Sequence, residues 1–374
     1  MIYLDNSSTT RKKPLSVVYA TTLAMLKSAN PSRSSHTIAL NKALQVFNTR
    51  ENIKAFFNAP TEANVVFTYN CTEALNTAIL GTAKKGGNVV ITSFEHNSTI
   101  RPLHQLIKTH DISLTIAKPN NNGIITEIDI LNSVTEKTYL VIINQTSNVT
   151  GTTIKLTDLG HKLNKKGIIL IVDTAQSAGH EKIDMQKIGA NILCVAGHKG
   201  LYASQGIGAL ILNDVNINSL KFGGSGSNSL DTNMPSYYPE KLEAGTINTV
   251  GISALNAGIN YVTKHFDKIN KKITKLSNKL LNYLKTNNNI TLYSFNPNSG
   301  VISFKFNNLD NNEVSNILNE KYKICVRPGL HCAPLIHKFL KTEQTGLIRV
   351  SLSYFNKMSE INKLINAINK ISNN

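Results

Sequence analysis

The stretches "GIILIVDTAQSAG" (residues 167–179) and "NILCVAGHKGLYASQG" (residues 191–206) decide the fold. Each begins as an apolar run and ends abruptly in polar residues. Short apolar runs without alternation are typical of strands that are covered on both faces of a sheet. Similar runs, separated by helical patterns, are "NVVFTY", "NVVITS", "YLVIIN" and "IGALIL". This order predicts a mainly parallel α/β sheet with right-handed crossovers.

The pattern changes after about residue 256. Apolar residues then recur at three- and four-residue spacing, which predicts an amphipathic helix with a lysine-rich face; they are Phe266, Ile269, Ile273, Leu276, Leu280 and Leu284. Short strands ("ITLYSF", "GVISFKF"), a helix around "NNEVSNILNE" and a last amphipathic helix from Met358 to Ile371 follow. We predict a large domain over residues 14–256, and a small α+β domain made of residues 1–13 and 257–374.

The composition indicates an ordinary globular protein, with 41% hydrophobic and 17% charged residues among 374. The start, "MIYLDNSSTT", lacks the pattern of a secretory signal, and the apolar runs are too short to cross a bilayer. The 4 cysteines show no C-x-x-C spacing and no disulfide framework. We therefore expect a reducing, cytoplasmic setting and no membrane contact.

The net charge of +17 raises the alternative of a nucleic-acid partner. However, the lysines are spread along the chain, and the densest group falls on the polar face of the predicted long helix. We expect no dedicated nucleic-acid role. A basic binding protein that has lost catalysis remains the alternative from a different functional class.

Polar residues follow the predicted strands at the edge where open α/β sheets bind ligands. His96 follows "VVITS", Asp173 ends "GIILIV", and Lys199 follows "NILCV" in a glycine-bounded loop. A lysine in such a loop is a candidate for a Schiff base with a carbonyl compound. Asp173 has two possible roles, capping the next helix or holding a cationic ring nitrogen.

The segment "NCTEALN" after the first of these strands also has two interpretations. Asn70 and Glu73 have the spacing of a capping box. Alternatively, Thr72 and nearby backbone amides bind a phosphate at the helix N-terminus. With Lys199, Asp173 and His96, a phosphate site completes the set that an enzyme dependent on pyridoxal 5'-phosphate (PLP) needs. We expect no metal, because the spacing of His331, Cys332 and His337 fits no standard zinc pattern.

Nearly the full length is similar to the cysteine desulfurases of the class V aminotransferase family. The similarity is carried by an ordered set of motifs: "YLDNSSTT", "ANPSRSSH", "FTYNCTEALN", "ITSFEHNS", "NVTGTTIKL", "VDTAQSAGH", "AGHKGLYASQGIGAL", "LEAGTINTVGI", "RPGLHCAPLIHK" and "GLIRVSLSYFN". This resemblance implies PLP fold type I, with a large domain around a mainly parallel, seven-stranded-type sheet, a small α+β domain and an obligate homodimer.

The resemblance also implies roles in cofactor binding. Lys199 matches the lysine that binds PLP covalently, Asp173 the partner of the pyridine nitrogen, and Gln176 the donor to the ring hydroxyl. His96 matches the ring that stacks on the cofactor and takes part in proton transfer. The positions matching the phosphate ligands are Cys71, Thr72 and His198, and Thr246 from the other subunit.

The substrate and sulfur positions follow in the same way. Asn148, which also matches a cofactor-contacting position, and Arg349 match groups that hold the substrate carboxylate. Cys332 in "VRPGLHCAPL" matches the reactive cysteine, and the positive charge of Arg327 nearby favours its thiolate form. The resemblance implies conversion of L-cysteine to L-alanine with a persulfide on Cys332. The compact cysteine loop resembles the subgroup that passes sulfur to a dedicated acceptor protein, with iron–sulfur cluster assembly or tRNA thiolation as possible pathways.

Two positions depart from the family pattern. Ala196 stands where many relatives have a phosphate-binding serine, and Arg11 where a proline is common. The rival enzyme classes are a selenocysteine lyase or another class V lyase or aminotransferase. An aminotransferase has no use for the thiol of Cys332.

Overall fold

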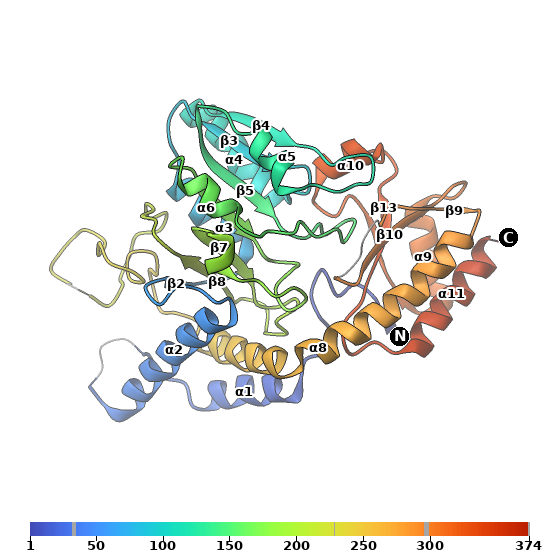
Figure 1. Cartoon of the computed structure of the whole chain (residues 1–374). Coiled ribbons are helices and arrows are strands. Elements are labelled where there is room, and N and C mark those ends of the chain that lie inside the picture. Colours follow the sequence, from blue (N-terminus) through green and yellow to red (C-terminus); the bar gives the residue numbers. More distant parts are fainter. Residues whose placement is uncertain (32–34, 228, 295–298, 373–374) are drawn as a thin grey trace.

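The computed structural model describes residues 1–31, 35–227, 229–294 and 299–372 (Figure 1). Residues 32–34 of "ANPSRSSH" and residue 295 of "ITLYSF" therefore lie outside the described residues. The described strands form a seven-stranded, a four-stranded and a two-stranded sheet. No helix among the described residues combines the length and the apolar character that crossing a membrane requires.

The seven-stranded sheet has the order β2-β8-β7-β6-β5-β3-β4. Its strands are β2 (Asn64–Thr68), β3 (Asn88–Thr92), β4 (Ser113–Ala117), β5 (Thr138–Asn144), β6 (Ile169–Asp173), β7 (Ile192–Ala196) and β8 (Gly208–Leu212). All neighbours are parallel except at β8, which is antiparallel to both β2 and β7. The predicted mainly parallel α/β sheet is confirmed. Strand β4 was not predicted from the sequence; it is an edge strand that is mostly exposed or half-buried.

Apolar packing covers both faces of this sheet, which explains why its central strands do not alternate. The neighbours Val89 and Val90 belong to different core clusters, as do Leu140 and Val141. The helices that connect these strands are α3 (Cys71–Gly81), α4 (Asn97–His110), α5 (Glu127–Asn132), α6 (Leu159–Asn164) and α7 (Met185–Ile188). Because helices pack on both sides, the carboxyl ends of the strands remain available for a site.

The C-terminal part forms an antiparallel sheet of order β12-β13-β10-β9. These strands are β9 (Ile290–Leu292), β10 (Val301–Phe306), β12 (Arg327–Gly329) and β13 (Leu347–Ser351). The accompanying helices are α9 (Asn311–Tyr322), α10 (Pro334–Leu340) and α11 (Met358–Ser372). At the N-terminus, β1 (Ile2–Tyr3) pairs in parallel with β11 (Ile324–Cys325), so both chain ends lie beside this sheet (Figure 1).

The long helix α8 (Thr249–Thr286) runs from below the large sheet to the C-terminal sheet (Figure 1). The predicted helix corresponds to the part of α8 from residue 264 onward, and the lysine-free part before it was not identified from the sequence. Helices α1 (Leu15–Leu26) and α2 (Thr37–Phe56) pack against α8. Since α8 is continuous through residue 256, the domain division at residues 13/14 and 256/257 remains a prediction.

Candidate active site

Lys199 lies in the loop that follows β7. The backbone of this loop packs tightly against the segment that contains Ala178. A Cβ atom added to Gly200 would lie only 2.1 Å from the Ala178 carbonyl oxygen, so only glycine fits there. Burial lowers the pKa of Lys199, although the carboxylate of Asp173 opposes this shift. The Lys199 Nζ has no hydrogen bond or ion pair to any of the described residues. A half-buried amine without such a partner is well suited to covalent chemistry with a carbonyl group.

Asp173 is the last residue of β6 and is buried. Its Oδ1 accepts hydrogen bonds from the amide of Ala175 at 2.8 Å and from the Cys71 thiol at 3.4 Å. Burial raises the pKa of Asp173, while the Ala175 amide and the Lys199 charge oppose the rise. Its Oδ2 accepts no hydrogen bond within the described part of the chain. This oxygen is therefore available to a cationic ring nitrogen.

At the N-terminus of α3, the capping interpretation of "NCTEALN" holds in part, and the phosphate interpretation remains a prediction. The Asn70 side chain accepts a hydrogen bond of 2.9 Å from the Glu73 amide. The Glu73 carboxylate, however, bonds the Tyr69 amide and Lys221 instead of the Asn70 amide, so the capping box is half formed. In the first turn, Thr72 Oγ1 lies 2.7 Å from Ser98 Oγ. Hydroxyls and helix-end amides thus meet at one place, as phosphate binding requires.

His96 follows β3 and caps α4 with its ring. Its Nδ1 lies 3.1 Å from the Ser98 amide and 2.8 Å from Ser98 Oγ. Burial lowers the pKa of His96 to about 4, and the charges of Lys199, Arg327, Arg349 and Arg101 act in the same direction. The ring is therefore neutral near pH 7.

The predicted cofactor residues of one chain line a single cavity. Its lining includes Cys71, Thr72, His96, Asn148, Asp173, Gln176, His198 and Lys199. Ala196 also lines the cavity, so this position offers no hydroxyl, whereas Ser98 does. Gln176 donates a hydrogen bond of 3.2 Å to the carbonyl oxygen of Ser7. The carboxyl ends of the parallel strands thus gather residues that are more than a hundred positions apart in sequence.

The two predicted arginines lie beside this cavity and meet at the N-terminal segment. Arg349, on β13, is 1% exposed and donates to the Asn148 carbonyl oxygen at 3.0 Å. It also forms an ion pair of 2.8 Å with Asp5 and a hydrogen bond of 2.9 Å with Ser8. Arg327 donates to the same Ser8 hydroxyl at 2.9 Å, and its Nη2 lies 4.0 Å from Cys332 Sγ.

Cys332 lies in the short turn between β12 and α10, and it is exposed. His331 and Cys332 both have left-handed backbones, with φ of 50° and 58°. Such backbone conformations are unfavourable for residues other than glycine, so contacts with the surrounding structure must stabilise the turn. The Asn148 side chain donates to the His331 carbonyl oxygen and the Asn97 amide to the Cys332 carbonyl oxygen, each at 2.7 Å. Cys332 lines a groove together with Thr72, His96, Ser98 and other residues of α3 and α4.

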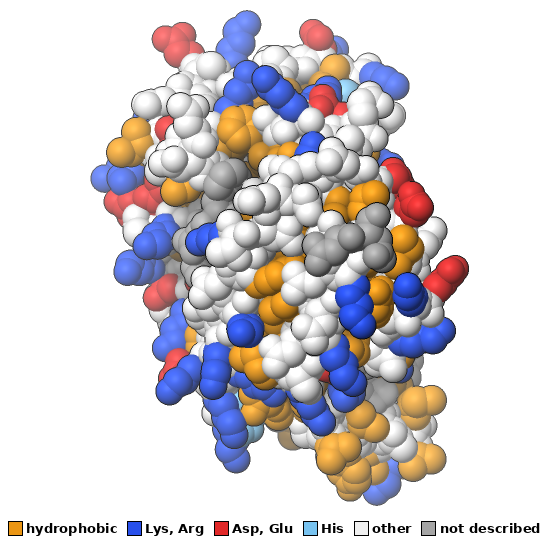
Figure 2. Space-filling model, turned by 90° about the vertical axis from the view of Figure 1, so that its right-hand side faces the viewer, with side chains coloured by type: hydrophobic (Ala, Val, Ile, Leu, Met, Phe, Trp, Pro, Cys, Tyr) orange, Lys and Arg blue, Asp and Glu red, His pale blue; other side chains and the backbone are white. Residues whose placement is uncertain are grey.

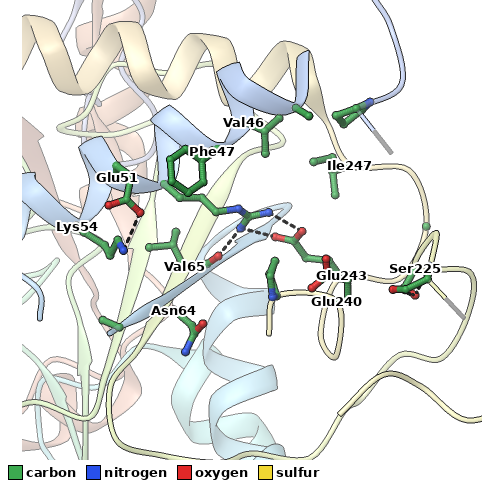
Figure 3. A pocket seen from close by; sticks show the side chains of 17 residues that line it. Val46, Phe47, Glu51, Lys54, Asn64, Val65, Ser225, Glu240, Glu243 and Ile247 are labelled. Carbon is green, nitrogen blue, oxygen red and sulfur yellow. Dashed lines mark hydrogen bonds and ion pairs between the residues drawn. The ribbon is translucent and has the colours of Figure 1, made fainter. Parts of the chain in front are cut away.

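Thr246 lies apart from the cavity that contains Lys199. It is exposed and lines a small pocket with Tyr69, Lys221 and other residues. Next to it is a larger hollow of about 500 Å³ between α2, β2 and the segment from Ser225 to Ile247 (Figure 3). In that hollow, the carboxylate of Glu243 pairs with Arg50 at 2.8 Å. In one chain alone, therefore, Thr246 does not reach the predicted cofactor site.

Sequence reasoning missed three residues of the site. Asp5 and Ser8 lie in the quoted motif "YLDNSSTT", but no role was assigned to them. Ser98 lies two residues after His96, and a hydroxyl at the second position of a helix was a signal that could have identified it.

The donor set fits PLP. The buried Asn148 Oδ1 and His198 Nδ1 have no hydrogen-bond partner among the described residues. Unpaired buried polar atoms are rare in folded proteins and are expected where a ligand supplies the missing partner. Lys199 Nζ, Asp173 Oδ2 and the α3 N-terminus offer the covalent, ring-nitrogen and phosphate contacts. Within the described ranges, no group of three or more His, Cys, Asp or Glu side chains is arranged to hold a metal.

Comparison with known proteins agrees with this geometry. The model of the family "Aminotransferase class-V" matches residues 2–364. A probable cysteine desulfurase of Methanothermobacter thermautotrophicus is 33% identical over 99% of this chain and 94% of that protein. A probable cysteine desulfurase of Borreliella burgdorferi is 32% identical over 99% of this chain and 92% of that protein.

Solved structures show the same relationship. The apo structure of a cysteine desulfurase from Thermococcus onnurineus superposes with a TM-score of 0.91 and 29% identity, covering 100% of this chain and 94% of that one. The predicted PLP fold type I is thereby confirmed, as is the resemblance from which it was inferred. The family is PLP-dependent, which confirms the predicted cofactor. The chain belongs to the class V aminotransferase family.

Proposed function

We propose that this protein is a PLP-dependent cysteine desulfurase, which converts L-cysteine to L-alanine and retains the sulfur as a persulfide on Cys332. The observation that carries the proposal is the position of this thiol. Cys332 is exposed in a groove that shares Thr72, His96 and Ser98 with the cavity of Lys199 and Asp173. A nucleophile and a PLP cavity on one continuous surface are what sulfur extraction requires.

Different residues of this chain perform different parts of the proposed reaction. Bound PLP supplies an electron sink for the reaction at the substrate Cα. Burial lowers the pKa of Lys199, which favours the neutral amine that can take the Cα proton. Asp173 presents its free Oδ2 to the cationic ring nitrogen, while Cys71 and the Ala175 amide hold its other oxygen.

The sulfur step uses Cys332. Its thiolate attacks the sulfur atom of L-cysteine and forms an S–S bond. The substrate C–S bond breaks, its electron pair goes to carbon, and a proton completes alanine. The enzyme thiol is oxidised to the persulfide level and the substrate carbon is reduced, so no external oxidant is needed. The guanidinium of Arg327 lies 4.0 Å from Cys332 Sγ.

The substrate carboxylate is assigned to Arg349 and Asn148. Without substrate, Asp5 and Ser8 bind the Arg349 guanidinium, which prevents it from being a buried unpaired charge. We propose that the carboxylate of L-cysteine takes over part of these contacts. Asp5 then acts as the internal counterion of the free enzyme.

A homodimer is part of the proposal. Large apolar side chains are exposed on α1 and α2: Leu15, Val18, Tyr19, Leu23, Met25, Leu26, Ile38, Leu40, Leu44 and Phe47. A surface of this kind is typical of an interface with another chain. The exposed Thr246, which does not reach the Lys199 cavity of its own chain, favours a second copy as the occupant. We propose that Thr246 contributes to the partner's phosphate site.

A sulfur-acceptor protein is the proposed next partner, with iron–sulfur cluster assembly as the proposed pathway. Cys332 is accessible from a groove formed by α3 and α4, so a thiol on another protein can approach it. The 4 cysteines are unpaired in the structure. Persulfide chemistry of this kind needs a reducing compartment, for which we propose the cytoplasm.

The two rival functions predict different properties of this protein. A selenocysteine lyase would use the same cavity and differ in its discrimination against L-cysteine. A nucleic-acid-binding protein without catalysis would be expected to gather its cations into a stripe. On the face in Figure 2, Lys and Arg side chains are instead scattered among polar and apolar ones.

The test is the mass of the protein after exposure to L-cysteine without reductant. The wild type gains one sulfur atom on the peptide containing Cys332 and releases alanine. Cys332→Ser keeps the PLP absorbance and its shift on adding L-cysteine, but forms neither the persulfide nor alanine at the wild-type rate. Cys325→Ser, at a half-buried cysteine seven residues upstream, is the matched control and behaves as wild type. Sulfur on Cys71, Cys194 or Cys325 would contradict the assignment.

A further inference from the structure

Two donors converge on one nitrogen of the His96 ring. The Ser98 amide nitrogen lies 3.1 Å from His96 Nδ1, and Ser98 Oγ lies 2.8 Å from it. A backbone N–H can donate but cannot accept a hydrogen bond. Nδ1 must therefore present its lone pair, and the proton of the neutral ring is on Nε2. This assignment follows from the amide geometry and does not depend on how the hydroxyl is rotated.

The direction of the neighbouring hydrogen bonds follows from this tautomer. Because Nδ1 carries no proton, the Ser98 hydroxyl donates to it. The Thr72 hydroxyl, 2.7 Å from Ser98 Oγ, then donates to Ser98. A chain of hydrogen bonds therefore runs from Thr72 in α3 through Ser98 in α4 to the His96 ring. Ser98 is 8% exposed, so water competes little for these bonds.

We infer that Ser98 is a positioning residue, which holds His96 as the neutral ring with its proton on Nε2 and links the ring to Thr72 at the proposed phosphate site. The inference deepens the proposed function, because it rests on the His96 role in that reaction. No hydrogen bond to Nε2 is present within the described part of the chain. Nε2–H is thus free to donate to a ligand in the cavity.

This tautomer determines whether His96 can accept a proton from the substrate. A ring that has its proton on Nε2 and two donors at Nδ1 has no free lone pair with which to accept another proton. The charges that lower the pKa of His96 are those of Lys199 after β7, Arg327 on β12, Arg349 on β13 and Arg101 on α4. The carboxyl group of Asp173 on β6 lines the same cavity, but it is not among the main causes of this shift. The cations too disfavour an imidazolium. His96 is then a stacking ring and a hydrogen-bond donor, and proton transfer at the substrate is assigned to Lys199.

The test uses cofactor-free protein labelled with ¹⁵N-histidine, so its result does not depend on desulfurase activity. Long-range ¹H–¹⁵N spectra distinguish the two neutral tautomers and the imidazolium. His96→Gln identifies the His96 signals among the 10 histidines. Wild type is expected to show the Nε2–H pattern at pH 7 and to remain neutral on acidification to about pH 5.

The variants separate a positioning role from a general structural one. In Ser98→Ala the loss of a donor to the neutral ring raises the ratio of imidazolium to neutral His96 about tenfold at a given pH. Ser98→Thr retains a hydroxyl and restores the wild-type titration. Thr109→Ala, at the far end of α4, is the control and leaves it unchanged. A wild-type Nδ1–H pattern, or a Ser98→Ala titration identical to that of wild type, overturns the inference.

Discussion

The amide nitrogen of Asn97 lies 2.7 Å from the carbonyl oxygen of Cys332 and donates a hydrogen bond to it. Asn97 is the first residue of α4, where amides have no partner within the helix. The Asn148 side chain binds the adjacent carbonyl oxygen, that of His331, at the same distance. Both left-handed residues of the cysteine turn are thus fastened to the rim of the cavity, one by a helix end and one by a side chain.

The first prediction distinguishes the contributions of these two hydrogen bonds to the stability of the turn. Asn148→Ala removes the donor to the His331 carbonyl oxygen, and the loss of about 1 kcal/mol increases opening of the turn about fivefold. Amide hydrogen exchange of the peptide covering residues 327–334 should accelerate accordingly. Asn97→Ala is the matched control, because it keeps the backbone amide that makes the other bond. Equal exchange in Asn148→Ala and wild type would show that the side chain does not hold the turn.

The second prediction concerns the covalent link. Wild-type protein reconstituted with PLP should be yellow, and borohydride should fix the cofactor irreversibly to Lys199. Lys199→Ala should bind PLP without a covalent bond and lose it on dialysis. Lys338→Ala, in α10, should behave as wild type. Mapping the reduced cofactor to a lysine other than Lys199, or failure of wild type to bind PLP, would contradict the proposed function.

Local sequence patterns were sufficient for the large sheet except its edge strand β4, and for two residues at its carboxyl edge. Asp173 and Lys199 could be identified because each directly follows an apolar strand, and parallel strands end at one edge. The contacts of Arg349 could not be identified in this way. Its partners Asp5, Ser8 and Asn148 come from a terminal segment and a loop, whose positions depend on packing between distant elements.

Helices α1 and α2 were also not predicted from the sequence, because packing with other elements determines their pattern of apolar residues. Helices α1 and α2 carry apolar residues on both their buried and exposed sides, so they lack the periodicity of an amphipathic helix. This is the pattern expected if a second chain covers them. The exposed apolar residues that remove the helical periodicity are therefore the same residues that make α1 and α2 candidates for an interface.

The third prediction tests shared sites. Lys199→Ala and Thr246→Ala homodimers should each have low activity. A mixed dimer with one subunit of each kind has one site with both defects and one site with neither, if Thr246 serves the partner's site. Statistical exchange makes about half of the dimers mixed, so activity should recover to about a quarter of the wild-type value. No recovery despite exchange demonstrated by mass would place Thr246 outside the partner's site.

Glu95 provides the basis for the last prediction. It lies just after β3, beside His96, and is fully buried. Its Oε1 accepts hydrogen bonds from Thr92 Oγ1 and the Asn144 amide, each at 2.8 Å, so it joins the ends of β3 and β5. Its Oε2 has no hydrogen-bond partner among the described residues. Burial raises the pKa of Glu95 to about 8, although its hydrogen bonds act against the rise.

Glu95 should therefore make the protein less stable as the pH rises towards 8. The folded state holds the Glu95 proton up to a pKa of about 8, whereas the unfolded chain releases it near the ordinary glutamate value. Stability from this group is complete below the ordinary value and is lost as the pH rises to the folded pKa, at about 1.4 kcal/mol per pH unit. Glu95→Gln keeps the acceptor oxygen and has no proton to lose, so this slope should disappear. Urea unfolding at several pH values and fixed protein concentration measures it, with the exposed Glu136→Gln as control. Parallel pH profiles for wild type and Glu95→Gln would mean that Glu95 is ionised in the folded protein.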